Sequence, residues 1–191
     1  MIPKNIHKIH ISNLNAIKKE CFDYINQIKQ GNLDHRSGGN LRHSIDSDSR
    51  EISTALYDYL KNNFNILPQR FTFYVTPPGL HIPPHIDGGG IKNLQDLSWY
   101  GLNIPIANTE KSETKFYKVD AENMDGRWPI DKTKIEVIES HTITTPVIIN
   151  TSVLHSVENH NTEDTRIMLL IRWHPRFNFF KEVIKDENTL C

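Results

Sequence analysis

A run of short apolar segments between residues 70 and 173 is the feature that most constrains the fold. The first segment, RFTFYVT at 70–76, alternates in polarity, is rich in aromatic and β-branched residues, and ends at the turn sequence PPG. Seven further segments of strand length follow, separated by turn signals: 80–86, 99–106, 113–119, 134–138, 143–149, 152–157 and 166–173. Eight short strands in succession predict a β-sandwich or barrel.

The residues before these strands predict two helices. Apolar residues recur at helical spacing after Ser12, which can cap the first helix, and Gly31 is expected to end it. A second helix is expected over about 48–64, with its apolar residues on one stripe. Helices on one side of a sheet bury its outward apolar face, so we expect residues 13–65 to brace the larger sheet.

Two polar segments interrupt this pattern. Residues 32–46, between the helices, predict a loop that is either a solvated connection or a flap over a site. Residues 120–132 predict a long irregular insertion among the strands. Trp128 in this insertion could line a substrate cleft or anchor the loop.

Composition limits the partners and the compartment. The 191 residues suit one domain, and 22 Lys and Arg against 23 Asp and Glu give no electrostatic case for nucleic acid or an anionic membrane. No apolar run approaches the ~20 residues of a membrane span, and the first ten residues lack the apolar segment of a signal peptide. Cys21 and Cys191 form neither a disulfide scaffold nor a zinc motif. We therefore expect a cytoplasmic protein without a membrane or nucleic-acid partner.

The strongest indication of chemistry is the sequence His85-Ile86-Asp87, followed later by His155. Residues i and i+2 of a strand share a face, so His85 and Asp87 are expected to project together. Two histidines and one carboxylate on one face form the facial triad of non-haem Fe(II) oxygenases, which leaves positions for a bidentate 2-oxo acid and dioxygen. Imidazole also suits zinc, so the ligands alone leave the metal open.

Arg166 is the second indication, because it opens the apolar segment RIMLLIRW at 166–173. An arginine at the base of an apolar strand can bind a carboxylate through two parallel donors, whereas an edge arginine extends to water. Beside the triad we predict that Arg166 anchors the distal carboxylate of 2-oxoglutarate. Arg172, near the end of the same segment, is predicted to be structural or on the surface.

These residues resemble those of the Fe(II)- and 2-oxoglutarate-dependent oxygenases, and most closely the aspartyl/asparaginyl β-hydroxylase family, which includes proline hydroxylases. The matching stretches are TFYVTPPGLHIPPHIDGG at 72–89, YGLNIPI at 100–106 and NTSVLHSVENHNTEDTRIMLLIRWHP at 150–175. The resemblance implies a double-stranded β-helix, a cupin-like jelly roll, over residues 70–175. The chain would then be one oxygenase domain, with helical N-terminal support over 1–69 and a C-terminal tail over 176–191.

The resemblance also implies roles for single residues. His85, Asp87 and His155 match the metal ligands, and Arg166 matches the arginine that binds the distal carboxylate of 2-oxoglutarate. Thr72 matches a hydroxyl residue that assists this arginine. The family usually has a histidine on the strand before the Ile-Pro pair, to help hold the cosubstrate. Here Trp99 stands in its place, and Asn103 shares the face of Trp99, so either residue could contact the 1-carboxylate instead.

The expected activity is hydroxylation of a C–H bond, with Fe(II), 2-oxoglutarate and dioxygen, in an amino acid that is free or part of a polypeptide. Three alternatives remain: a metal-binding cupin-like module without oxygenase activity, a metal-dependent isomerase, and a nucleic-acid demethylase of the same superfamily. The demethylases use two arginines with the spacing of Arg166 and Arg172. They carry Asn and Thr between these arginines, which this chain lacks. The sequence leaves the oligomeric state open.

Overall fold

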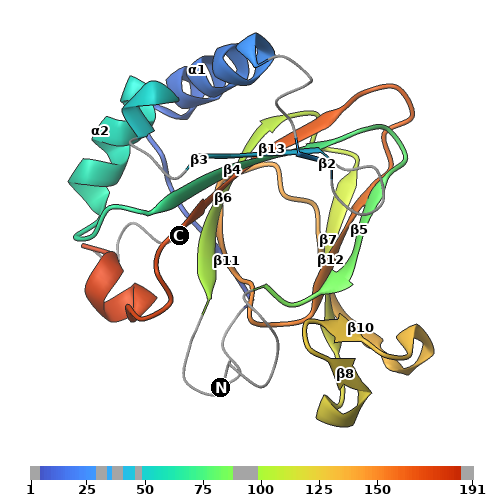
Figure 1. Ribbon diagram of the computed structural model, residues 1–191. Helices are drawn as coiled ribbons and strands as arrows, with labels where there is room; N and C mark the ends of the chain where they lie inside the picture. Colours follow the sequence, from blue (N-terminus) through green and yellow to red (C-terminus); the bar gives the residue numbers. More distant parts are fainter. Residues whose placement is uncertain (1–4, 29–33, 36–40, 46–48, 88–98, 186–191) are drawn as a thin grey trace.

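Two antiparallel sheets face each other in the computed structural model, which describes residues 5–28, 34–35, 41–45, 49–87 and 99–185 (Figure 1). The larger sheet has the strand order β1-β11-β6-β13-β4-β3-β2, and the smaller sheet has the order β10-β7-β12-β5. This arrangement is the mainly β, jelly-roll fold with N-terminal helices that the sequence predicts.

The strands are short. The larger sheet contains β1 (Ile6–Lys8), β2 (Asp34–His35), β3 (Leu41–Ile45), β4 (Arg70–Thr76), β6 (Tyr100–Ala107), β11 (Val147–Asn150) and β13 (Arg166–Arg172). The smaller sheet contains β5 (His81–His85), β7 (Ser112–Lys118), β10 (Glu136–His141) and β12 (His155–Asn159). A separate hairpin joins β8 (Met124–Asp125) to β9 (Trp128–Pro129). The eight predicted strands are therefore confirmed, with boundaries shifted by a few residues.

The segment 32–46 is not simply a loop, and this prediction is wrong in part. Strand β3 pairs with β4 along its length, and β2 pairs with β3 at the edge of the larger sheet. Three of the five residues in LRHSI are polar, so the segment gives little apolar signal of a strand. Strands β1 to β3 also show that the N-terminal part is not purely helical. The division at residues 69 and 175 stays a prediction.

Both predicted helices form, with different starts. Helix α1 (Leu14–Gln27) has Asn13, not Ser12, at its N-cap, while Gly31 lies outside the described residues. Helix α2 (Thr54–Asn63) starts later than predicted, because the Ser53 side chain accepts a hydrogen bond from the Leu56 backbone N–H and caps it there. Short 3₁₀ turns occur at η3 (Ser49–Glu51), η5 (Ala121–Asn123) and η6 (Lys132–Lys134), and a π-helical turn, η7, at Phe179–Val183.

The two faces of the larger sheet have different tasks. Figure 1 shows both helices outside this sheet, away from the smaller one. On β4, Phe71 and Phe73 are buried in the apolar core that includes the helices, as are Leu169 and Ile171 of β13. Residues of opposite parity on these strands face the inside of the barrel. The helices thus brace the sheet, and the inward face is free to build a site.

Within the described residues, no helix is long and apolar enough to cross a membrane.

Gly101 on β6 marks a close contact inside the larger sheet. A Cβ at this position would lie 2.7 Å from Leu170 Cδ1 and 3.4 Å from the Ile171 carbonyl oxygen. We expect Gly101→Ala to lower the free energy of unfolding by about 1–3 kcal/mol through overpacking. Urea denaturation measures this change. In the Leu170→Ala background the same substitution should cost clearly less, and an equal cost in both backgrounds would contradict the clash.

Candidate metal and cosubstrate site

The predicted triad assembles where β5 ends and β12 begins. His85 and His155 are opposite residues of these antiparallel strands, and their ring centroids are 4.6 Å apart. Asp87 follows β5, and its backbone N–H donates to the Thr151 carbonyl oxygen (3.0 Å). All three side chains are buried, and one ligand atom from each lies within 4.8 Å of the others. The strand pairing therefore brings both histidines to one point and the loop at Thr151 places the carboxylate beside them.

Backbone carbonyls fix the orientation of both imidazoles. His85 Nδ1 lies 2.8 Å from the Pro83 carbonyl oxygen, and His155 Nδ1 lies 2.9 Å from the Val153 carbonyl oxygen. A carbonyl can only accept, so each Nδ1 carries a proton, and the neutral form of each ring has its lone pair on Nε2. The Nε2 atoms face Asp87, at 3.4 Å (His85 to Oδ1) and 3.9 Å (His155 to Oδ2). Both rings thus present the atom that binds a metal.

Burial and neighbouring charges keep Asp87 and His155 in the protonation states that bind a metal. Burial alone would raise the pKa of Asp87, but the Arg172 guanidinium and the two imidazoles outweigh it and hold this pKa below its usual range. Burial, followed by the proximity of His85, lowers the pKa of His155 to about 4. At neutral pH the carboxylate is ionised and the His155 imidazole is neutral, as metal binding requires. Two nitrogens and one carboxylate oxygen on one side fit Fe(II), with the remaining positions open.

Arg166 on β13 is the most unusual residue of the site. Its exposed fraction is 3%, and its Nε donates to Ser112 Oγ at 3.1 Å. No carboxylate among the described residues forms an ion pair with it. Burial lowers the pKa of Arg166 to about 10, so the guanidinium stays charged at neutral pH. A buried cation without a counter-ion is costly, which indicates that an anionic ligand belongs beside it.

The triad and Arg166 line one space inside the barrel, a cavity of about 60 Å³ that we call the metal cavity. Asn103 of β6 also lines it, which agrees with its predicted place near the cosubstrate. Tyr74, Thr114 and Thr151 line it too, although no motif in the sequence marks them as site residues. Tyr74 has the same parity on β4 as Thr72, and this alternation was the only signal that could have found it.

The structure places Thr72 away from Arg166, the residue it was predicted to assist. In the pairing of β4 with β13, Thr72 lies opposite Leu170, whereas Arg166 lies opposite Thr76. The Thr72 hydroxyl is 3.2 Å from Ser44 Oγ on β3. The hydroxyl that contacts the Arg166 guanidinium is that of Ser112 on β7, in the facing sheet.

Trp99 contributes to the metal site through its backbone carbonyl group. Its side chain does not line the metal cavity. Its carbonyl oxygen accepts from the Thr151 backbone N–H (2.7 Å) and from Thr151 Oγ1 (3.0 Å). Because Thr151 in turn accepts from the Asp87 N–H, Trp99 holds the loop that positions the carboxylate. Of the two residues predicted near the 1-carboxylate, only Asn103 faces this space.

Arg172 is part of the site, which corrects its prediction as a structural or surface residue. Its Nη2 forms an ion pair with Asp87 Oδ2. A second guanidinium, that of Arg127, lies 3.5 Å from Asp87 Oδ1. Arg127 also lies over the ring of Trp128, which is 5.6 Å from the His85 ring. The irregular insertion at 120–132 therefore reaches the metal group, and Trp128 lies at the site rather than serving only to anchor the loop.

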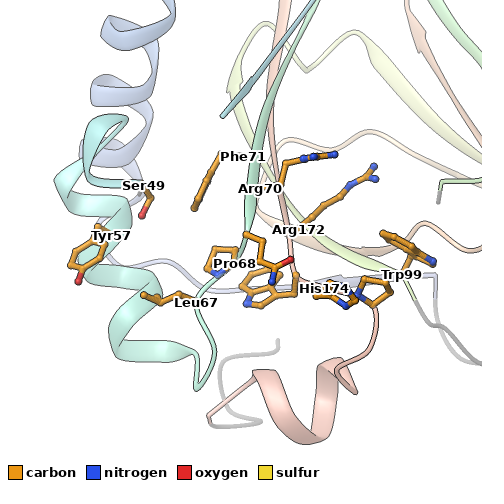
Figure 2. A pocket seen from close by; sticks show the side chains of 12 residues that line it. Ser49, Tyr57, Leu67, Pro68, Arg70, Phe71, Trp99, Arg172 and His174 are labelled. Carbon is orange, nitrogen blue, oxygen red and sulfur yellow. The ribbon is translucent and has the colours of Figure 1, made fainter. Parts of the chain in front are cut away.

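Arg172 also borders a second, larger space. This outer cavity has a volume of about 970 Å³, and Arg70, Trp99 and His174 line it together with Arg172 (Figure 2). Ser49, Tyr57 and Leu67 also line it, and Figure 2 shows them on the helix side of β4, whereas Arg70 and Arg172 extend from the other side of this strand. Since Arg172 lines both cavities, the two spaces adjoin at this side chain.

Comparison with solved structures finds proteins of similar fold. No protein-family model and no curated protein matches the sequence. The structure is similar to a Pseudomonas putida prolyl-4-hydroxylase (12% identity, TM-score 0.53, 89% of this chain and 93% of that chain covered). It is also similar to SnoK, a non-haem α-ketoglutarate-dependent carbocyclase from nogalamycin biosynthesis (10%, 0.60, 89% and 80%). A third is the viral collagen prolyl hydroxylase of Paramecium bursaria Chlorella virus-1, solved as its 2-oxoglutarate complex (14%, 0.50, 88% and 95%).

At these identities the similarity shows the fold. The chain has the double-stranded β-helix of 2-oxoglutarate-dependent oxygenases, and it carries a buried His/Asp/His group of the kind that binds iron. The comparisons do not reach the aspartyl/asparaginyl hydroxylase family, so that finer resemblance stays a prediction.

Proposed function

We propose that this chain is an Fe(II)- and 2-oxoglutarate-dependent oxygenase that hydroxylates a C–H bond of an amino acid, free or within a polypeptide. The observation that carries the proposal is the shared metal cavity, which is lined by a buried metal-ligand triad and by a buried arginine that forms no ion pair with any described residue. When bound, iron and 2-oxoglutarate would supply the oxidation of the C–H bond, coupled to conversion of 2-oxoglutarate and dioxygen to succinate and carbon dioxide.

The side chains have separate tasks in this proposal. His85, Asp87 and His155 hold the metal on one side, and the carbonyls of Pro83 and Val153 fix the two rings. Arg166 binds the distal carboxylate of 2-oxoglutarate, which needs a permanently charged, two-donor partner in a low-dielectric barrel. The resemblance at 150–175 supports a place in the aspartyl/asparaginyl hydroxylase family. A reducing, cytoplasmic location fits the free, buried thiol of Cys21, while Cys191 lies outside the described residues.

Uncoupled turnover tests the proposed function. The protein loaded with Fe(II) should convert 2-oxoglutarate slowly to succinate in air without added substrate, and His155→Ala should not. A cupin-like binding module would give no succinate, and a metal-dependent isomerase would act on its substrate without oxygen. Succinate assayed by chromatography, with an anaerobic sample as control, distinguishes these cases. Absence of succinate from a correctly metallated wild type would contradict the proposal.

A nucleic-acid demethylase is the second candidate, because Arg166 and Arg172 both enter the site. The net charge of −1 and the missing Asn and Thr between these arginines weigh against it. Demethylation of a methylated oligonucleotide, followed by mass spectrometry, would decide in its favour.

Ser112, rather than Thr72, supplies the hydroxyl group that orients the Arg166 guanidinium in this proposal. Ser112→Ala should weaken 2-oxoglutarate binding by about 1 kcal/mol, roughly fivefold, because the Arg166 guanidinium loses a hydrogen bond that orients it. Thr72→Val should leave this affinity unchanged, since Thr72 pairs with Ser44 instead. Anaerobic calorimetric titration with 2-oxoglutarate measures both. A larger loss in Thr72→Val than in Ser112→Ala would restore the original assignment.

A further inference from the structure

We propose that the substrate carries a free carboxylate and that Arg127, on the hairpin of β8 and β9, binds this group beside the metal ligands. The inference rests on the proposed function, because it names the chemical class of molecule that reaches the metal from the solvent side. The carboxylate belongs either to a free amino acid or to an acidic side chain of a peptide, and the experiment below separates these two sources.

The hairpin is fixed against the strand that leads to two of the metal ligands. The backbone N–H of Ile86, which lies between these ligands in the sequence, donates to the Arg127 carbonyl oxygen at 2.9 Å. Asp125 and Trp128 are register partners, and Gly126 between them has a φ of +57°. Gly126 therefore takes the first central position of a two-residue turn, and Arg127 takes the second. The backbone thus places Arg127 next to the metal ligands.

Asn123 closes the base of the hairpin. Its buried side chain donates to the Asp131 carbonyl oxygen (2.8 Å) and accepts from the Asp131 backbone N–H (2.9 Å). Its own carbonyl oxygen accepts from the Ile130 backbone N–H (2.8 Å). These hydrogen bonds tie the start of the insertion at 120–132 to its end. The insertion therefore has a defined shape, which allows it to present a binding residue.

Arg127 and Trp128 cover the triad on the side that faces solvent. The Arg127 side chain is 42% exposed and Trp128 is 40% exposed, whereas His85 and Asp87 are buried. The Arg127 guanidinium lies 5.2 Å from the Trp128 ring centroid, and this ring lies 5.6 Å from that of His85. Neither Arg127 nor Trp128 lines the metal cavity. A molecule that approaches the triad from solvent therefore meets these two side chains first.

Positive charge exceeds negative charge at this point. Arg127 Nη2 lies 3.5 Å from Asp87 Oδ1, and Arg172 pairs with Oδ2 of the same carboxylate. Two guanidinium groups thus share one carboxylate, which a divalent metal would share as well. The 1-carboxylate of 2-oxoglutarate would offset only part of this charge, since its distal carboxylate belongs to Arg166. An anionic group of the substrate beside Arg127 would complement the remainder.

The Arg127 guanidinium has donors that the described residues leave unused. Its Nε is buried without a hydrogen-bond partner among those residues. Its Nη2 contact with Asp87, at 3.5 Å, is longer than the about 2.7–2.9 Å of a charge-assisted hydrogen bond. Arg172 differs, because its Nη2 is hydrogen-bonded to this carboxylate. Since a guanidinium matches both oxygens of a carboxylate with a planar fork of N–H groups, Arg127 has the capacity to bind a further acid.

This position gives Arg127 a role in specificity. An acid bound by Arg127 would have its carbon skeleton beside the triad, with the Trp128 ring as an apolar surface for it. The fixed hairpin would thereby position a C–H bond for oxidation. An amide of the same shape would leave the guanidinium without a counter-ion, so the site would select acids over amides.

The test compares acids with their amides. Protein loaded with Mn(II) in place of Fe(II), and saturated with 2-oxoglutarate without oxygen, is titrated calorimetrically with the L-amino acids, with their α-amides, with capped peptides containing Asp, Glu, Asn or Gln, and with a methylated oligonucleotide. We expect an acid to bind about 10- to 100-fold more tightly than its amide, as for hydrogen bonds to a charged group. Tighter binding of free amino acids than of capped peptides identifies the α-carboxylate; preference for capped Asp or Glu peptides identifies the side chain.

Variants at Arg127 show whether this preference belongs to the hairpin. Arg127→Gln should lose most of the preference for the acid and leave amide binding unchanged, while Arg127→Lys should keep part of it. Lys134→Gln is the matched control, because it removes a positive charge from an exposed side chain 3.9 Å from Asp131. It should leave the preference intact. Circular dichroism verifies folding, and Trp128 fluorescence gives a second binding readout, with Trp128→Phe as its control.

Affinities for Mn(II) and 2-oxoglutarate are measured in the same variants. In Arg127→Gln both should fall far less than the affinity for the acid, since Arg127 is neither a metal ligand nor part of the lining of the metal cavity. A loss of 2-oxoglutarate affinity as large as the loss of acid affinity would assign Arg127 to the cosubstrate and overturn the inference.

Four other outcomes would also overturn it: equal affinity for acids and amides, equal effects of Arg127→Gln and Lys134→Gln, no binding of any acid at millimolar concentration, or tight binding only of the oligonucleotide. Wild-type succinate formation is measured in parallel. Succinate without any acid preference defeats the inference alone. Absence of succinate defeats the proposed function, and an acid preference that depends on Arg127 would still support the anion site.

Discussion

Arg166→Met should weaken 2-oxoglutarate binding about 30-fold to several-thousand-fold while Fe(II) binding is retained. The distal carboxylate of the cosubstrate would enter the barrel without a cationic partner, and removing one partner of a buried charge pair costs roughly 2–5 kcal/mol. Methionine is similar in length and apolar, so the core position of this side chain stays filled. Titration of 2-oxoglutarate into anaerobic Fe(II)-loaded protein, followed by the metal-to-ligand absorption band, measures the change.

Arg176→Met is the control for this experiment, since Arg176 lies on the surface over Phe177. It should leave the 2-oxoglutarate affinity unchanged. Arg172→Met is not a suitable control, because Arg172 pairs with the metal ligand Asp87. If Arg166→Met and Arg176→Met bound 2-oxoglutarate equally well, Arg166 would not be the anchor, and the buried cation would need another explanation.

His155→Ala should lower Fe(II) affinity by more than about 100-fold. Loss of residues that merely support metal ligands already costs about 10- to 100-fold, and His155 supplies a ligand atom directly. His141→Ala is the matched control: its imidazole lies 3.1 Å from Glu139 on the partly exposed strand β10, outside the triad. Metal content after dialysis against a chelator of known affinity gives the result. Equal iron content in wild type and His155→Ala would exclude the triad.

The parts of the site that could be predicted from the sequence depend on local periodicity. His85 and Asp87 lie two residues apart at the end of one strand, so their shared face follows from the pleat alone. Arg166 could be recognised because a charged residue stands at the start of an otherwise apolar strand segment. The double-stranded β-helix followed from the succession of short strands and from the resemblance at 150–175.

The errors concern register and irregular structure. Thr72 and Thr76 have the same parity on β4, and only the pairing with β13 decides which of them lies opposite Arg166. No local pattern in either strand encodes that offset. Arg127 approaches Asp87 from an insertion without periodicity, so no sequence pattern could place it there. Arg172 has the same parity on β13 as Arg166, but its position at a strand end suggested solvent, whereas Asp87 lies there.

The two halves of the site belong to different sheets. The histidines are on β5 and β12 of the smaller sheet, while Arg166 is on β13 of the larger one. A 2-oxoglutarate molecule that contacts the metal at one end and Arg166 at the other would therefore act as a non-covalent cross-link between the sheets. Ligand at a hundred times its dissociation constant stabilises a folded protein by about 2.7 kcal/mol. In this barrel that free energy would oppose separation of the two sheets. Binding of the cosubstrate and association of the two sheets would therefore be thermodynamically linked.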